Sequence, residues 1–129
     1  MSIEPEDYAL DTVVVSYQHF TVDSDGTAAA AGTVTFELIS PTRIKTAEGI
    51  DVTLKPIVGY LGEDGAMRRG SRFGEEGVPL VCVARDFPVD ELVYRAKFDL
   101  TDGLGSGRIR QKDITFAVRD DDIDLTELT

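Results

Sequence analysis

The amino-acid sequence predicts an all-β fold, and three observations support this class. Apolar and polar residues alternate with a period of two over several segments, as they do in strands with one buried face. Turn residues, chiefly Gly, Pro and Asp, separate these segments at intervals of about 8 to 15 residues. No segment with a helical period is long enough to cover a sheet, as an α/β fold would require. We therefore expect an antiparallel β-sandwich of about seven to eight strands, Ig-like or fibronectin-like, with a partly open β-barrel as the alternative.

Residues 11–20 form the first predicted strand. They are rich in Val, Thr and Tyr, and residues two apart can share one face: Val13, Val15 and Tyr17. Residues 23–27 follow as a turn, because Asp can bond its own backbone and Gly26 can supply a positive φ. Residues 28–32 are small and predict only a weak link to the next strand.

Residues 33–39 alternate cleanly, and the strand that they predict ends at the Ser-Pro step 40–41, because proline cannot donate to a ladder. The residues expected to face inward are Val34, Phe36 and Leu38. Residues 50–54 and 57–61 are also strand-like. Because Pro56 separates them, we interpret them as one kinked edge of the sheet.

The strongest hairpin signal in the chain lies at residues 62–65. Asp64-Gly65 suits a two-residue type I′ turn, in which both central residues have positive φ. Residues 66–77 are rich in glycine and arginine, which predicts an exposed loop. Residues 78–84 are almost continuously apolar and predict a central strand.

Two further segments alternate, at residues 92–98 and 111–118, with a glycine-rich loop at 102–107 between them. The predicted inward-facing residues are Leu92, Tyr94, Ala96 and Phe98 in the first, and Ile114, Phe116 and Val118 in the second. The last residues, about 120–129, are acidic, with three apolar residues between the acids: Ile123, Leu125 and Leu128. This pattern is typical both of an acidic C-terminal arm and of an edge strand of the same domain.

Composition predicts one domain over residues 1–129. The hydrophobic fraction of 42% and the charged fraction of 29% are those of an ordinary globular protein. A chain of this length buries enough surface to fold without a metal or a disulfide, so we expect no cofactor. Cys82 is the one cysteine, which excludes an intramolecular disulfide and fits a reducing compartment.

The net charge of −11 argues against nucleic acid or an anionic membrane as a partner, because phosphate contacts need clustered Lys and Arg. No apolar run approaches the roughly 20 residues that span a bilayer, and the acidic N-terminus lacks the features of a signal peptide. Arg68, Arg69 and Arg72 form the one local basic cluster. On so acidic a chain, we expect this cluster to contact an acidic patch on a protein partner.

Catalytic sites are predicted to be absent, and the protein is expected not to be an enzyme. His19 is the only histidine, so a nucleophile–histidine site would have to use it, yet it lies inside a predicted strand. Cys82 lies among Leu80, Val81 and Val83, where a thiolate would be poorly solvated. Both residues are interpreted as structural.

Metal sites are also predicted to be absent. Residues 23–26 resemble the start of a calcium loop, but the position that needs a bidentate Glu falls on Val34, so we interpret the segment as a turn. The carboxylates at 120–122 and Asp124 follow one another on an extended segment, where adjacent side chains point opposite ways. Zinc lacks its usual Cys and His ligands.

Short motifs occur in a characteristic order along the chain. They are Val14-Val15, Asp25-Gly26-Thr27-Ala28, Gly32-Thr33-Val34-Thr35-Phe36, Leu92-Val93-Tyr94-Arg95-Ala96 and Ile123-Asp124-Leu125-Thr126-Glu127-Leu128. In this order they resemble the N-terminal β-domain of minor tail and tail-fibre proteins of actinobacterial phages. That domain has a D-G-T-P-A turn, a G-T-V-T-F strand, a W-x-Y-x-V strand and an acidic V-D-L-A-D-L segment. This chain departs from the pattern with Ala29 in place of proline and Leu92 in place of tryptophan.

The resemblance implies a structural virion protein of a tailed phage, made in the bacterial host cytoplasm. It would act by assembly with other virion proteins, as a homo-oligomer or in many copies. The expected contact residues are Arg68, Arg69, Arg72, Ile123, Leu125 and Leu128. If residues 120–129 are a docking arm, their deletion leaves the domain folded but unable to assemble. A capsid decoration protein and a β-sandwich that binds carbohydrate or a host surface are the alternatives, and the absence of Trp counts against carbohydrate.

Overall fold

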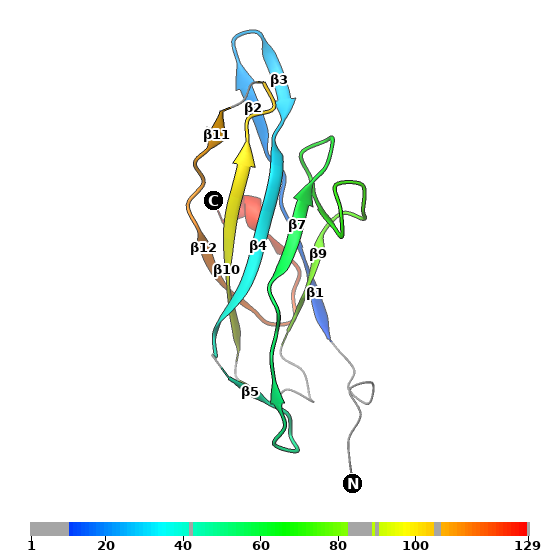
Figure 1. The fold of residues 1–129 in the computed structure, drawn as a ribbon, viewed down its shortest axis with the longest axis vertical. Helices are drawn as coiled ribbons and strands as arrows, with labels where there is room; N and C mark the ends of the chain where they lie inside the picture. Colours follow the sequence, from blue (N-terminus) through cyan, green and yellow to red (C-terminus); the bar gives the residue numbers. More distant parts are fainter. Residues whose placement is uncertain (1–10, 42, 83–88, 90, 105–106, 129) are drawn as a thin grey trace.

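The computed structural model describes residues 11–41, 43–82, 89, 91–104 and 107–128, and the structural statements below concern these residues. They form thirteen strands and one short 3₁₀ helix, with no α-helix among them. The all-β fold class is confirmed. Figure 1 shows the longer strands running side by side along the long axis of the molecule.

The larger sheet has six strands in the order β11-β10-β4-β7-β8, with β12 also paired to β10. The strands are β4 (Ala31–Ser40), β7 (Ile57–Leu61), β8 (Met67–Arg69), β10 (Leu92–Thr101), β11 (Arg108–Ile109) and β12 (Ile114–Val118). β4 and β10 are its centre, paired antiparallel along almost their whole length. Because β7 pairs with both β4 and β8, it is an inner strand rather than the predicted edge.

The smaller sheet has three strands in the order β13-β1-β9, with β13 (Ile123–Asp124), β1 (Thr12–Ser16) and β9 (Val78–Val81). The β1–β13 ladder is parallel, which departs from the antiparallel pattern expected throughout. The prediction of a central strand at 78–84 is wrong among the described strands, because β1 occupies the centre and β9 lies at one end. The apolar run there has another cause: Val78 and Leu80 are fully buried because they face the larger sheet.

Two short hairpins complete the fold. One joins β2 (Phe20–Asp23) to β3 (Gly26–Ala29), and the other joins β5 (Ile44–Lys45) to β6 (Asp51–Val52). Two expectations are corrected here. Residues 28–32 are mostly strand and not a weak link, since pairing with β2 and β10 overrides the low strand propensity of Ala and Gly. Residues 50–54 and 57–61 are not one kinked edge, because β6 and β7 belong to different sheets.

The core lies between the two sheets and follows the predicted alternation. Its largest fully buried side chains come from both layers: Phe36, Leu92 and Leu100 from the larger sheet, and Val13, Val15 and Leu80 from the smaller. Tyr94 on β10 donates its hydroxyl hydrogen bond to the carbonyl oxygen of Val81 on β9, at 2.9 Å. This bond links the layers across the core, and the arrangement is that of a β-sandwich.

The β7–β8 hairpin is confirmed, but its predicted type I′ turn is wrong. Gly65 has φ +77°, whereas no described residue other than glycine has a positive φ, so Asp64 does not meet the type I′ requirement. The Gly62 N–H donates to the Ala66 carbonyl at 2.9 Å, which makes a longer loop with Gly65 in the left-handed position. Residues 67–69 are strand β8, and Met67 is buried, so the segment 66–77 is not a loop throughout.

Hydrogen bonds join the two sheets along one flank of the sandwich. The Met67 N–H donates to the Tyr17 carbonyl at 2.8 Å, and the Gly77 N–H donates to the Met67 carbonyl at 2.9 Å. Met67 on β8 is thus bonded both to Tyr17, which directly follows β1, and to Gly77, which directly precedes β9. On the other flank, no ladder among the described strands joins β11 or β12 to β13, so the described strands do not close into a barrel.

Candidate functional site

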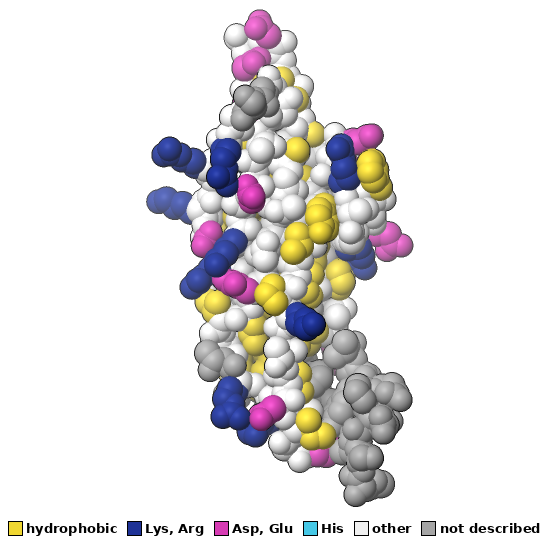
Figure 2. All heavy atoms as spheres, in the orientation of Figure 1, with side chains coloured by type: hydrophobic (Ala, Val, Ile, Leu, Met, Phe, Trp, Pro, Cys, Tyr) yellow, Lys and Arg dark blue, Asp and Glu magenta, His cyan; other side chains and the backbone are white. Residues whose placement is uncertain are grey.

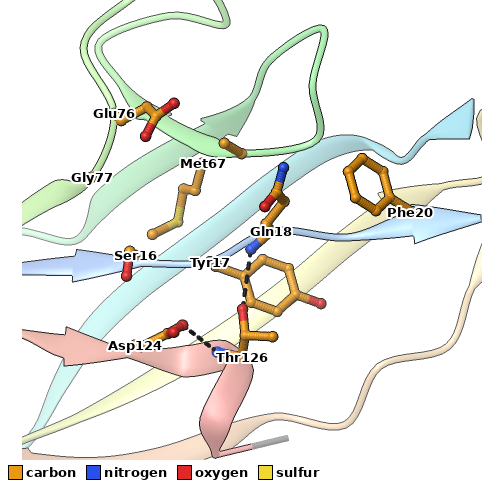
Figure 3. A pocket seen from close by; sticks show the side chains of 10 residues that line it. Ser16, Tyr17, Gln18, Phe20, Met67, Glu76, Gly77, Asp124 and Thr126 are labelled. Atoms are coloured by element: carbon orange, nitrogen blue, oxygen red, sulfur yellow. Dashed lines mark hydrogen bonds between the residues drawn. The ribbon is translucent and has the colours of Figure 1, made fainter.

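A hollow of about 380 Å³ lies where β1 continues toward β2, and the C-terminal segment forms one of its walls (Figure 3). Thr126 holds this wall in place: its hydroxyl accepts from the Gln18 N–H at 3.2 Å, and its own N–H donates to Asp124 Oδ1 at 2.9 Å. Glu76 contributes a second carboxylate to the lining. The polar groups of this hollow therefore anchor the C-terminus to β1.

A smaller hollow of about 240 Å³ adjoins the first and shares Tyr17, Gln18, Phe20 and Thr126 with it. Within it the Tyr17 hydroxyl lies 2.6 Å from His19 Nδ1. Burial raises the pKa of Tyr17, so the phenol stays protonated at neutral pH. His19 is half-buried and its ring is held by this bond, which fits the structural role predicted for it.

A third hollow, of about 760 Å³, is lined by Phe98 and by residues 108–112, and it shares Gln111 with the second. We call it the basic hollow. Arg108 forms an ion pair with Asp99 at 2.9 Å, whereas Arg110 and Lys112 form none with any residue that the structure describes. Figure 2 shows Lys and Arg side chains gathered along the side of the molecule where β11 and β12 lie. This site was not predicted from the sequence, although cations at every second position from 108 to 112 were an available signal.

The arginine cluster divides into two residues that hold their own loop and one that faces outward. Arg68 donates to the Gly74 carbonyl at 3.0 Å and pairs with Asp64 at 3.1 Å, and Arg69 donates to the Gly77 carbonyl at 3.0 Å. Arg72 is exposed. Its guanidinium carbon lies 5.2 Å from the centre of the Phe73 ring. Of the three predicted contact residues, Arg72 is thus the best placed to reach a partner.

Phe73 and Asp64 lie beside this cluster. Phe73 is 75% exposed and was not singled out from the sequence, where its segment was predicted only to be an exposed loop rich in glycine and arginine. The hydrogen bond from the Ala66 N–H, together with the charge of Arg68, holds the pKa of Asp64 below its usual value. The loop is therefore a preformed turn with one aromatic and one cationic side chain at its surface.

The C-terminal segment is folded onto the domain as an edge strand followed by a 3₁₀ helix (Leu125–Glu127). The Val14 N–H donates to Asp122 Oδ1 at 2.9 Å, and the β1–β13 ladder follows. Leu125 is fully buried and Ile123 packs partly against the core, while Leu128 is 52% exposed. Of the three predicted contact residues in this segment, only Leu128 has a largely exposed side chain in this conformation.

The β2–β3 hairpin projects from one end of the molecule (Figure 1) and carries acidic side chains at its tip (Figure 2). Asp23 Oδ1 accepts from the N–H groups of Asp25 at 2.7 Å and Gly26 at 3.0 Å, which shapes the turn. Phe20 is 54% exposed and Val22 is 69% exposed. The turn was predicted from the sequence, but this apolar pair was not, although its period-two spacing beside an acidic turn was an available signal.

The remaining candidate residues are either buried in the core or too far apart to form a site. Cys82 is buried, and burial raises the pKa of its thiol, which keeps it protonated. Within the described ranges, no three His, Cys, Asp or Glu side chains come together to hold a metal ion, at residues 23–25 or 120–124 or elsewhere. No helix in the described part of the chain is long and apolar enough to cross a membrane.

Comparisons of the chain with protein-family models, with curated proteins and with solved structures found no match. The likeness to phage tail proteins therefore stays a prediction from the motifs of the sequence. Three exposed features of the structure bear on function: the projecting hairpin, the basic hollow and the Arg72–Phe73 pair.

Proposed function

We propose that this protein is a structural component of a tailed-phage virion, a minor tail or tail-fibre attachment protein that acts by binding other virion proteins. The observation that carries the assembly function is the β2–β3 hairpin. It projects from the sandwich with Phe20 and Val22 exposed on one face. A two-stranded hairpin is marginally stable in water unless its apolar face is covered, and an apolar patch with a polar rim is typical of a protein contact. The placement in a virion comes from the order of the sequence motifs.

The titratable residues that the sequence singled out support a role other than catalysis. His19 is bonded to Tyr17, Cys82 lies in the core, and Asp23 shapes a turn. Each of these groups is engaged in holding the fold. A catalytic site would need such groups to converge on a place where substrate can bind.

Assembly is favoured over carbohydrate binding by the state of the exposed aromatic rings. Sugar-binding sites of β-sandwich modules use aromatic faces that are free to stack. One face of Phe73 is covered by the Arg72 guanidinium, and Phe20 lies on a projecting hairpin beside acidic residues. Aromatic and arginine side chains in this combination are typical of contacts between proteins.

The proposal is tested by gold-labelled antibodies raised against the purified protein and applied to phage particles made by cells that carry this gene. We expect label at one discrete position on the tail, together with the protein's peptides in the mass spectrum of purified particles. Label over the capsid shell would instead identify a decoration protein. Unlabelled particles, with the protein left in the soluble cell fraction, would contradict a virion role.

A further inference from the structure

We propose that the acidic β2–β3 hairpin of one copy docks into the basic hollow of a second copy, so that the chain associates with itself. This inference deepens the proposed assembly function and rests on it, because it names the partner as the same chain. The two surfaces consist of different residues, although they adjoin where Phe20 and Gln111 line the smaller hollow together. Two such contacts related by a two-fold axis close a dimer, and a contact that repeats from copy to copy is heterologous. It builds a ring where the rotation closes, and a filament where it does not.

One face of the hairpin is already covered by its own chain. The Thr21 hydroxyl is buried, and the turn after β10 approaches so closely that a Cβ added at Gly103 would collide with Ala28 and Ala29. Phe20 and Val22 point the other way, since residues two apart on a strand share a face. The hairpin is therefore held from behind and presents an apolar face with Asp23 and Asp25 at its tip.

The basic hollow offers the complementary surface. Its apolar part is formed by Phe98 and Ile109, both partly buried, and its rim by Arg108, Arg110 and Lys112. Two of these cations form no ion pair with a described residue, on a chain whose net charge is −11. A basic rim with two such cations around apolar side chains matches an acidic turn that carries apolar side chains behind it.

The same chain leaves both surfaces open. Phe20 and Val22 stay more than half exposed, so the hollow of their own copy does not cover them. A second copy supplies both complementary surfaces, because each molecule carries one hairpin and one hollow. Charge complementarity at this contact also offsets, locally, the repulsion between two acidic chains.

The test is a charge exchange in the full-length chain, followed by sedimentation velocity. The hairpin variant combines Asp23→Asn, whose amide oxygen still accepts the turn hydrogen bonds, with Asp25→Lys. The hollow variant combines Arg110→Glu with Lys112→Glu. We expect the wild type to associate and each variant alone to associate at least about tenfold more weakly. An equimolar mixture of the two variants should form complexes again, because the reversed charges attract.

Controls make single charge changes of the same sign elsewhere. Asp121→Asn and Lys55→Glu alter exposed side chains outside both surfaces and should leave the dissociation constant of the wild type unchanged. Val22→Ser tests the apolar half of the contact and should weaken association without any charge change. Circular dichroism of each variant verifies that it is folded.

The inference is overturned by a monomeric wild type, by association that the two variants leave unchanged, or by variants that do not restore complexes when mixed. None of these outcomes bears on the antibody labelling of particles, which tests the virion role by itself. If the virion is labelled but the purified protein does not associate with itself, another virion protein, and not a second copy, covers the hairpin.

Discussion

At the scale of single residues, Tyr94 shows how one hydroxyl links the two sheets. Its side chain is buried on β10 and donates to the Val81 carbonyl on β9 at 2.9 Å. Burial raises the pKa of Tyr94 to about 12, because a phenolate there would lose its water. The folded protein thus requires the neutral phenol, while the unfolded chain ionises near the ordinary value of 10.0.

We expect Tyr94→Phe to lower the free energy of unfolding by about 1 to 2 kcal/mol at neutral pH, since the Val81 carbonyl loses its donor. Below about pH 10 the tyrosine is protonated in both states and adds no pH dependence. Between about pH 10 and pH 12 the unfolded wild type releases this proton while the folded wild type keeps it, so the wild type loses stability. Urea unfolding followed by circular dichroism should show the gap between the two proteins narrowing over this range. A gap that stays constant would contradict the linkage.

At the scale of elements, β8 and the loop after it are held by arginine side chains rather than by apolar burial alone. Arg68 and Arg69 donate to the carbonyls of Gly74 and Gly77, which ties the loop back to the strand that precedes it. Arg72 makes no such bond and lies over Phe73. Loss of the Arg68 or Arg69 side chain therefore removes hydrogen bonds that hold the loop, whereas loss of the Arg72 side chain removes only a surface contact with Phe73.

We expect Arg69→Ala to lower the free energy of unfolding by about 1 to 2 kcal/mol, because the Gly77 carbonyl is left without its charged donor. Arg68→Ala should have a similar effect through Gly74. Arg72→Ala is the matched control, and its effect should stay within about 0.5 kcal/mol. The measurement is urea unfolding, with chymotrypsin cleavage after Phe73 as a local readout that accelerates in the first two variants. Equal stability of all three variants would show that the loop bonds contribute nothing.

At the scale of the whole molecule, the first and last strands of the described chain lie side by side. β1 and β13 form a parallel ladder, and the hydrogen bond from the Val14 N–H to Asp122 spans 108 residues of sequence. Leu125 enters the core behind this ladder. The expectation that residues 120–129 can be deleted without loss of folding is therefore reversed: their removal takes away an edge strand and a buried side chain, and we expect the truncated chain to be strongly destabilised.

Two leucines of the C-terminal segment allow a cleaner measurement. Leu125→Ala should lower the free energy of unfolding by about 2 to 4 kcal/mol, because it leaves a cavity in the core. Leu128→Ala, three residues later and largely exposed, should change it by less than about 0.5 kcal/mol. Equal effects in urea unfolding would mean that the segment is not docked in solution and acts as the free arm considered from sequence.

Local patterns predicted the fold class and the inward faces of the long strands. Alternation identified Val34, Phe36 and Tyr94 as inward-facing, and the structure buries all three. Propensity failed at residues 28–32, where pairing with β2 and β10 decides the outcome. The candidate surfaces were predicted less well. Exposure of Phe73 and of the Phe20–Val22 pair depends on what the rest of the chain leaves uncovered, and no local pattern states that.

By itself, then, the sequence determined the class of fold, the strand faces and most of the turns, because these follow from the period of two and from the backbone preferences of Gly, Pro and Asp. Tertiary structure alone decided which arginines hold the loop, whether Leu125 is core or surface, and that Arg110 and Lys112 border a hollow beside Phe98. The physical reason is that ion pairing, burial and concavity depend on residues far apart in the chain. The alternation that marks an edge strand is the same whether that strand is packed on its own domain or extended toward a partner.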